Sequence, residues 1–185
     1  EESSEVATCL NNIGLALTGL GKYQDALTYQ ERALEMRKKV LGEKHRSVAL
    51  SYNTMGSCLW ELGQYKESLK SYENALTVYR NVYGEDSPYV AKSMNNIGIS
   101  LFALGQYEEA LEFSQKALKI YSRGFDKEYF EIGTCFNNIG MNLEALGKNQ
   151  EALEYHQKAL IIREKVFGTY HPEVAMSYNN IGMTL

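Results

Sequence analysis

The side chains of this chain best suited to binding a transition metal or relaying a proton are those of three histidines and three cysteines. His45 and His171 stand 126 residues apart (171 − 45), and so do Cys9 and Cys135 (135 − 9). A shared interval of this kind indicates equivalent places in a repeated structure and not one common site. Because His156 falls on a different predicted helix, no two histidines are expected to meet at a metal ion or form a proton relay. We therefore predict that the chain is not an enzyme and has no catalytic residue, metal site or cofactor.

Asparagine pairs are the second candidate for chemistry, because a side-chain amide both donates and accepts hydrogen bonds. They occur in the quartet Asn95-Asn96-Ile97-Gly98 and in close copies of it at 11–14, 137–140 and 179–182, and the copy at 53–56 has Thr54 in place of the second asparagine. The quartet glycines are 42 residues apart throughout (56 − 14, 98 − 56, 140 − 98 and 182 − 140). A constant period of this length is typical of a repeat array.

Each repeat is predicted to be two helices joined by a tight turn. In the first repeat, apolar residues follow helical spacing from Val6 to Leu20, Gly21 ends that helix, and a second stripe runs from Tyr23 to Leu41. The connections are short, so paired helices must run antiparallel and pack against each other. We expect further first helices at about 47–62, 88–104, 128–146 and 172–185, and further second helices at about 65–83, 107–124 and 149–167.

The predicted fold class is all-α, a right-handed α-solenoid of antiparallel helix pairs. Residues 1–185 are interpreted as a single repeat array, and its ends inside the pattern suggest a fragment of a longer one. The predicted divisions are repeats 6–47, 48–89, 90–131 and 132–173, and a partial repeat 174–185.

Helix boundaries also have local signals. Pro88 and Pro172 stand at the first turn of a predicted helix, where a missing amide N–H costs nothing. Ser87 and His171 precede them and are the predicted caps. The connection after the third pair departs from the pattern of the others, and Asp126 is expected to cap the helix that follows it.

The quartet glycines lie inside a predicted helix, where glycine costs about 0.5–1 kcal/mol relative to alanine. Their recurrence predicts that the two helices of a repeat approach so closely that a Cβ atom would collide. Gly98→Leu is therefore expected to separate the helices of the third repeat. The second asparagine of each quartet neighbours the core stripe, and we expect it to satisfy backbone groups at the end of the preceding helix.

Composition argues against several classes of partner. A formal charge of −4 and a pI near 5.5 disfavour nucleic acid binding, which usually needs a basic surface. No apolar run approaches the roughly 18 residues of a membrane span, and the first residues are unlike a secretory leader. The cysteines are too far apart in the predicted array for Cys9 and Cys135 to pair, and free thiols fit a reducing compartment. We predict a soluble, cytoplasmic protein.

The pattern within a repeat resembles the tetratricopeptide repeat, in a 42-residue form. It contains Asn-Asn-Ile-Gly, then Leu-Gly-Lys-Tyr, then two Ala-Leu pairs. Residues 159–175, followed by Asn179-Asn180, are very similar to the repeat unit of kinesin light chains. This resemblance implies that the helix face carrying the first asparagine of each quartet lines a concave groove that takes up peptides.

The residues expected to line this groove combine amides with apolar and aromatic side chains. The amides are expected to hold the backbone of a bound peptide, with hydrogen bonding between stacked helices as the alternative. Trp60 and Phe102 hold the same position in adjacent repeats, so their rings are expected to lie together and anchor a ligand, unless they pack against neighbouring helices. The predicted site residues are Asn11, Asn53, Ser57, Trp60, Lys92, Asn95, Ile99, Phe102, Asn137, Met141 and Asn179.

The favoured function is therefore a protein-interaction scaffold that binds an extended or short helical segment of another protein. Lys92 is the one basic residue in the predicted groove, which disfavours a clamp for a terminal carboxylate and weakens any transfer of a preference for acidic peptides. The alternatives are a structural rod that self-associates end to end and the sensing array of a larger signalling protein.

Overall fold

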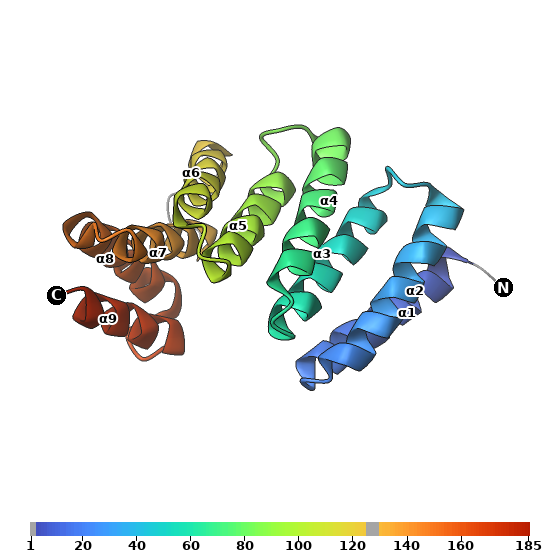
Figure 1. Cartoon of the computed structure of the whole chain (residues 1–185), viewed down its shortest axis with the longest axis horizontal. Helices are drawn as coiled ribbons and strands as arrows, with labels where there is room; N and C mark the ends of the chain where they lie inside the picture. The colour runs from blue at the N-terminus through green and yellow to red at the C-terminus, as the bar shows by residue number, and fades with distance from the viewer. Residues whose placement is uncertain (1–2, 125–129) are drawn as a thin grey trace. The chain divides into compact units, whose positions relative to one another are not determined.

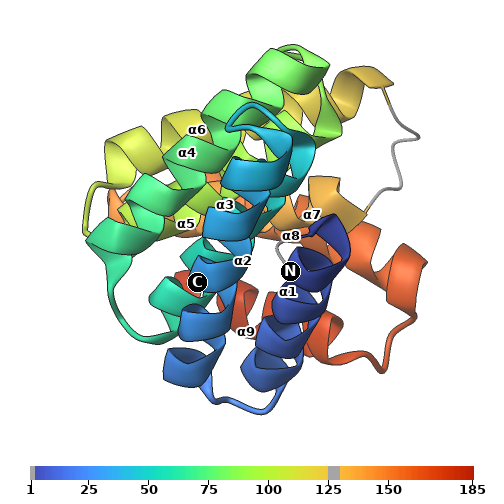
Figure 2. The same cartoon turned by 90° about the vertical axis from the view of Figure 1, so that its right-hand side faces the viewer.

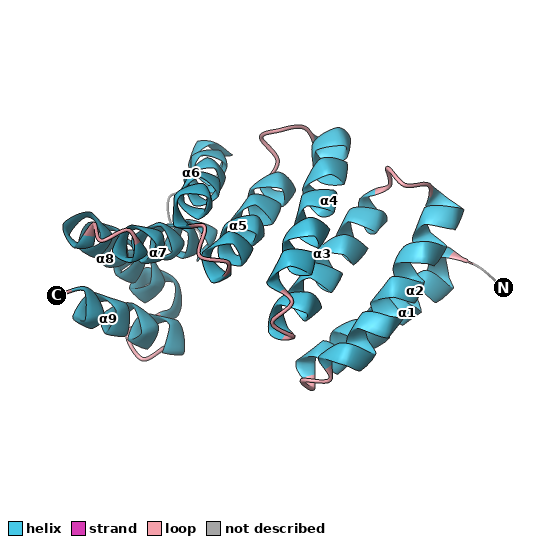
Figure 3. Ribbon diagram, in the orientation of Figure 1, coloured by secondary structure: helices cyan, strands magenta, loops and turns pink. Residues whose placement is uncertain are grey.

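The computed structural model describes residues 3–124 and 130–185, whose regular structure is helical throughout (Figure 3). The predicted helices agree with the described ones to within two residues at each end, and the expected start at residue 128 lies outside the described residues. The described helices are α1 (Ser4–Gly19), α2 (Tyr23–Leu41), α3 (Arg46–Glu61), α4 (Tyr65–Tyr83), α5 (Pro88–Ala103), α6 (Tyr107–Gly124), α7 (Phe130–Ala145), α8 (Asn149–Phe167) and α9 (Pro172–Thr184).

The chain forms two compact units, Glu1–Ser100 and Leu101–Leu185, which we describe separately as unit 1 and unit 2. In unit 1, α1 packs against α2 and α3 packs against α4, while α2 also contacts α3 (Figures 1 and 2). In unit 2, α7 packs against α8, and the flanking helices α6 and α9 contact α7 and α8 respectively. The molecule is thus all-α and built from the predicted helix pairs.

Two predicted helix caps are present. The Ser87 hydroxyl accepts a hydrogen bond from the Tyr89 N–H at 3.3 Å at the start of α5. At the start of α9, Nδ1 of His171 accepts from the Glu173 N–H at 3.2 Å. His45 caps α3 in the same way. These contacts satisfy amide groups that a helix start leaves without intrahelical partners.

Glycines end the long second helices. Gly42 follows α2 with φ 82°, and Gly168 follows α8 with φ 79°. Side chains other than glycine rarely adopt this region, so the residue type fixes where these helices stop. The predicted cap at Asp126 lies outside the described residues.

Gly14, Gly56 and Gly140 are packing positions, as predicted, whereas a Cβ atom built at Gly182 would meet no described atom of another helix within 4 Å. A Cβ atom at Gly56 would lie 2.7 Å from the Tyr72 ring, and one at Gly140 would lie 2.6 Å from the His156 ring. Small residues on the second helix complete the close approach, since Ala26 is fully buried. The expected effect of a larger residue at position 98 stays a prediction.

Candidate functional site: the groove beside helix α3

Two adjoining hollows, of about 310 and 240 Å³, lie beside helix α3 in unit 1. They share Ser57, Tyr72 and Asn96, and we call them together the α3 groove. Five of the predicted site residues line it: Asn53, Ser57, Trp60, Lys92 and Ile99. The remaining lining residues are Leu15, Thr18, Gln30, Thr54, Tyr72 and Asn96.

The walls and the floor of the α3 groove come from different helices. Helices α1, α3 and α5, the first helices of successive repeats, supply the walls. Gln30 of α2 and Tyr72 of α4 lie beneath them, and both are buried. Each faces a quartet glycine, because Gly14 and Gly56 leave space that a larger residue would fill. The repeat pattern therefore places one second-helix side chain under each first helix.

Asparagine side chains join the first helices of successive repeats. Asn96 Nδ2 donates to Asn53 Oδ1 at 3.0 Å. In unit 2, Asn180 Nδ2 donates to Asn137 Oδ1 at 2.9 Å. The second asparagine of a quartet therefore bonds the first asparagine of the quartet before it. We predicted that the second asparagine bonds backbone groups at the end of the preceding helix. The bonds found here are instead the alternative predicted for the first asparagine, which is hydrogen bonding between stacked helices.

Asn11 and Asn137 differ from the prediction that the first asparagines are accessible. Their exposed fractions are only 2% and 4%. The reason is a buried arginine from the second helix: Arg37 Nη1 donates to Asn11 Oδ1 at 3.3 Å, and Arg163 Nη1 donates to Asn137 Oδ1 at 3.4 Å. Neither amide is open to a peptide in this structure.

Asn53 is the first asparagine that lines the α3 groove, and it is half-buried. At the position equivalent to Arg37 (37 + 42), its repeat has a tyrosine, Tyr79. The hydrogen bond from Asn96 uses the Asn53 carbonyl oxygen. Asn53 and Asn96 both line the wider hollow, and the bond between them does not use the Asn53 amino group, a donor, or the Asn96 carbonyl oxygen, an acceptor.

Trp60 and Phe102 each pack against a tyrosine of the following helix. The Trp60 and Tyr65 ring centroids are 6.0 Å apart, and those of Phe102 and Tyr107 are 5.3 Å apart. This arrangement is the alternative that the sequence left open for both rings. Trp60 still lines the narrower hollow, and its buried indole N–H has no hydrogen-bond partner within the described residues.

The other predicted residues lie away from these hollows. Asn95 is half-buried on α5. In unit 2, Met141 is half-buried and its sulfur accepts from Asn137 Nδ2 at 3.3 Å. Asn179 is exposed, and its amino group donates to the Met183 sulfur at 3.4 Å. Phe102 also belongs to unit 2.

The interior of the α3 groove is uncharged. Burial raises the pKa of the Tyr72 hydroxyl to about 12. Burial also raises the pKa of Cys58, which lies beside Gln30. Both groups are therefore neutral at physiological pH. Lys92 is the one basic residue among the described lining residues, and it is exposed.

Sequence reasoning missed the floor residues and the buried arginines. Gln30 and Tyr72 each follow a quartet glycine by 16 residues (30 − 14 and 72 − 56). The equivalent residues in the next repeats are Ser114 and His156, so the residue type changes while its surroundings recur. A position whose residue type varies while the rest of the repeat stays the same was the feature of the sequence that could have identified these floor residues.

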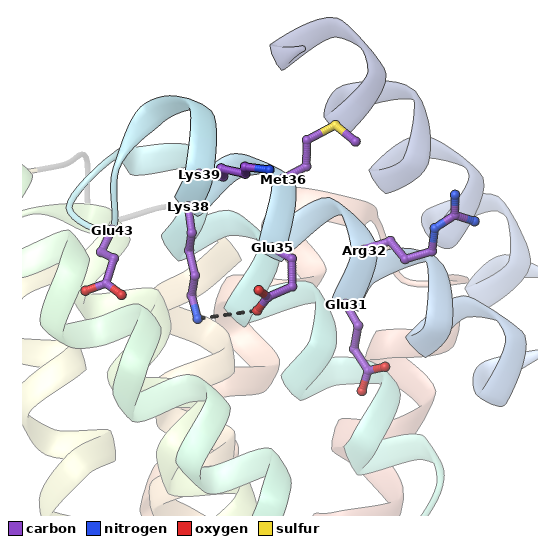
Figure 4. A pocket seen from close by; sticks show the side chains of 7 residues that line it. All are labelled: Glu31, Arg32, Glu35, Met36, Lys38, Lys39 and Glu43. Atoms are coloured by element: carbon purple, nitrogen blue, oxygen red, sulfur yellow. Dashed lines mark ion pairs between the residues drawn. The ribbon is translucent and has the colours of Figure 1, made fainter. Parts of the chain in front are cut away.

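A larger hollow, of about 800 Å³, lies along α2 and is not our candidate. Figure 4 shows its lining side chains extending in different directions, with an ion pair of 3.8 Å between Lys38 and Glu35. Exposed charges of this kind contribute little to affinity, and none of the predicted site residues is present. The lining residues are Glu31, Arg32, Glu35, Met36, Lys38, Lys39 and Glu43.

A third hollow, of about 210 Å³, contains a layer of tyrosines at the start of α5. The Tyr79 and Tyr89 ring centroids are 5.4 Å apart, and those of Tyr83 and Tyr89 are 4.8 Å apart, with both pairs stacked. This layer fills the place that Arg37 fills one repeat earlier. We therefore interpret it as packing between helices.

Comparison with known proteins gives the same architecture. Residues 5–70, 47–123 and 131–185 match the profile of the tetratricopeptide repeat. A crystal structure of a putative kinesin light chain from Podosopora anserina, with nearly identical repeats, has a TM-score of 0.81 and 19% identity, covering 100% of this chain and 87% of that one. A variant of the same protein has a TM-score of 0.82 and 20% identity, with coverage of 100% and 86%.

BtubC from P. vanneervenii is similar as well, with a TM-score of 0.77, 24% identity, and coverage of 90% of this chain and 66% of that one. At these identities the likeness establishes the fold alone, and it confirms the predicted all-α solenoid of helix pairs. Among curated proteins, no sequence matches this chain. Across the described ranges, every helix is too short or too polar to cross a membrane.

Proposed function

We propose that this chain, which belongs to the tetratricopeptide repeat family, binds an extended or short helical segment of another protein in the α3 groove. Repeats of this family generally mediate protein–protein interaction or scaffolding. One observation carries the proposal: two adjoining hollows lie against the first helices of unit 1 and include five of the residues expected to contact a peptide. We propose no catalytic activity for it.

The chemistry of the groove suits a polypeptide backbone. The Asn53 amino group is a donor for a peptide carbonyl, and the Asn96 carbonyl oxygen is an acceptor for a peptide N–H. These two groups do not depend on the side chains of the ligand. Trp60 and Ile99 add apolar surface along the narrower hollow, where a ligand side chain would bury most area.

The single tryptophan makes the test direct. Trp60 is the one tryptophan of the chain, so a ligand in the groove should change the fluorescence emission of the whole protein. Random linear peptides displayed on phage would be selected on the folded chain and then titrated while this emission is followed. We expect saturable binding, and we expect Ile99→Ala to weaken it about tenfold or more because an apolar anchor contact is lost.

The matched control is Glu73→Ala on α4, an exposed position outside both hollows. It should leave the affinity unchanged. Peptides that bind without altering Trp60 emission, and whose affinity survives Ile99→Ala, would place the binding surface elsewhere. Sedimentation velocity on the same samples addresses end-to-end self-association, which stays a prediction, because assemblies would then grow with protein concentration.

A further inference from the structure

The floor of the wider hollow contains a buried amide that lacks a strong hydrogen-bond partner. The Gln30 side chain is 0% exposed, and neither Nε2 nor Oε1 is hydrogen-bonded to an oxygen or nitrogen of the described residues. Leaving a buried donor and acceptor unbonded costs stability, and native structures rarely tolerate it without a reason. The equivalent position accepts Tyr72 and His156 in other repeats, so the repeat itself does not require an amide.

Neighbouring side chains hold this amide in place without satisfying it. Gly14 lets the Gln30 side chain lie against α1, because a Cβ atom there would come within 2.7 Å of Gln30 Cγ. The Cys58 thiol contacts the amide and is also hydrogen-bonded to the Thr18 hydroxyl, with Sγ and Oγ1 3.1 Å apart. The nearby amide and hydroxyl oppose the rise that burial causes in the Cys58 pKa, yet a thiol is only a weak partner. The Gln30 amide is therefore held in a fixed place at the floor of the hollow without a strong hydrogen-bond partner.

Charge around the hollow disfavours an ionic ligand group at this depth. Lys92 lies at the exposed rim. Glu61, which lines neither hollow, raises the pKa of Tyr23 and contributes to the rise at Tyr72. A carboxylate or ammonium group brought to Gln30 would lose its water without gaining an opposite charge there. A neutral group that donates and accepts at once matches the buried amide best.

We propose that the wider hollow receives an uncharged carboxamide side chain, asparagine or glutamine, of the bound segment, and that Gln30 recognises it by exchanging two hydrogen bonds with it. This inference rests on the proposed function, since it assigns a side-chain preference to the same groove. Asn53 and Asn96 hold the ligand backbone, and Gln30 reads one side chain beneath it. The ligand class is a segment with an amide residue at one fixed position.

The test compares peptide selections on three proteins. Random phage-displayed peptides are selected on the wild type, on Gln30→Leu, and on Gln24→Leu, which makes the same change at an exposed position of the same helix. The wild type and Gln24→Leu should enrich asparagine or glutamine at one peptide position, and Gln30→Leu should not. Replacing that peptide residue by glutamate or leucine should weaken binding to the wild type at least about tenfold, and to Gln30→Leu less than about twofold.

Gln30→Leu replaces a buried amide that lacks a strong hydrogen-bond partner with an apolar side chain of similar size. The variant should therefore fold at least as stably as the wild type. Gln30→Ser, with the residue that the third repeat has at this position, is the second variant should leucine disturb packing. Groove-binding peptides without amide enrichment, or an amide preference that persists in both Gln30 variants, would overturn the inference. If no selected peptide changes Trp60 emission, the proposed function fails instead, so the two failures are distinguishable.

Discussion

Helices α1–α3 of unit 1 and helices α7–α9 of unit 2 repeat one arrangement 126 residues apart (163 − 37). In each, a buried arginine at the end of the second helix joins three groups: an asparagine, a serine hydroxyl and a backbone carbonyl. Arg37 Nη1 donates to Ser51 Oγ at 2.7 Å and to the Ser47 carbonyl at 3.1 Å. Arg163 Nη1 donates to Ser177 Oγ at 2.8 Å. This contact fixes one repeat to the next.

The two arrangements differ in how the arginine charge is balanced. Arg163 also forms an ion pair of 3.1 Å with the Glu173 carboxylate, which stands where the first arrangement has Ser47. Among the described residues, Arg37 has no carboxylate partner. Burial lowers the pKa of both guanidinium groups; the Glu173 carboxylate opposes this at Arg163, whereas at Arg37 the opposing group is the Tyr79 phenol. Neutral acceptors thus suffice to hold a buried arginine between repeats, and the acid is an addition.

The largest expected effect is at this arginine. Arg163→Met should lower the free energy of unfolding by about 3 kcal/mol, because it leaves a partly buried acid without its partner. Arg37→Met should cost less, about 1.5–2 kcal/mol, since it removes only hydrogen bonds from a charged donor. Urea unfolding of both variants measures the difference. The control Arg80→Met breaks the exposed pair with Glu85, and it should cost less than about 1 kcal/mol. Equal losses at Arg163 and Arg37 would remove the distinction.

The second comparison concerns the quartet glycines Gly14 and Gly140, at which the first helix of a repeat packs closely against the second. Gly140→Ala should cost about 1–3 kcal/mol because its Cβ meets the His156 ring. Combining it with His156→Ser should recover most of that loss. Gly14→Ala combined with Gln30→Ser should recover less, because the Ala26 carbonyl oxygen would still lie 3.2 Å from the new Cβ. Double-mutant cycles from urea unfolding give both coupling energies.

The control for these variants is Gly19→Ala at the end of α1. Among the described residues, apart from the chain neighbours of Gly19 and the local backbone of α1, no atom lies within 4 Å of a Cβ built at Gly19. The same chemical change there should be neutral or stabilise the protein by up to about 1 kcal/mol, since alanine favours the helix. A loss at Gly19 as large as that at Gly140 would show that helix propensity, and not the crossing, governs these positions.

A smaller effect is expected from pH, which should change the stability of unit 2 through His156. Burial lowers the pKa of His156 below its ordinary value of 6.5, and Arg163 adds to this, while Glu144 opposes it. The folded state therefore prefers neutral histidine, whose contribution is complete above pH 6.5 and declines as pH falls towards the lowered pKa. Unfolding followed from about pH 8 to about pH 5 should show this decline, and His156→Tyr should reduce it. An unchanged pH profile in that variant would assign the decline to other groups.

The smallest effect is expected when the acidic residue beside Arg163 is introduced at the equivalent position beside Arg37. Ser47→Glu places a carboxylate where Glu173 stands in unit 2, so it should stabilise unit 1 by no more than about 1 kcal/mol. The gain should shrink in high salt, because the Glu173 side chain that it imitates is about one third exposed. Thermal unfolding at low and high salt measures this. A gain that is insensitive to salt would indicate a better helix start instead.

The sequence was sufficient for the fold because each helix has local signals. Pro88 and Pro172 mark starts, Gly42 and Gly168 mark ends, and the quartet glycines set the period. These features act through backbone conformation and steric contact, which depend little on the rest of the chain.

The candidate site was predicted less completely because it depends on contacts between repeats. Asn11 and Asn53 occupy equivalent positions, but Asn11 is buried against Arg37 of the adjoining second helix, whereas Asn53 is half-buried and its repeat has Tyr79 in place of that arginine. Gln30 was missed for a related reason, since its importance comes from its amide, which lacks a strong hydrogen-bond partner at the floor of a hollow. Repeat position alone does not reveal a partner across helices.

The quartet glycines allow the residue that packs against them to differ from repeat to repeat. At Gly14, Gly56 and Gly140 the first helix follows the same course over a glutamine, a tyrosine and a histidine. One residue per repeat can therefore be exchanged without rerouting the backbone around it. Duplicated units of this kind can diverge in what they recognise, one position at a time, while their helices continue to stack.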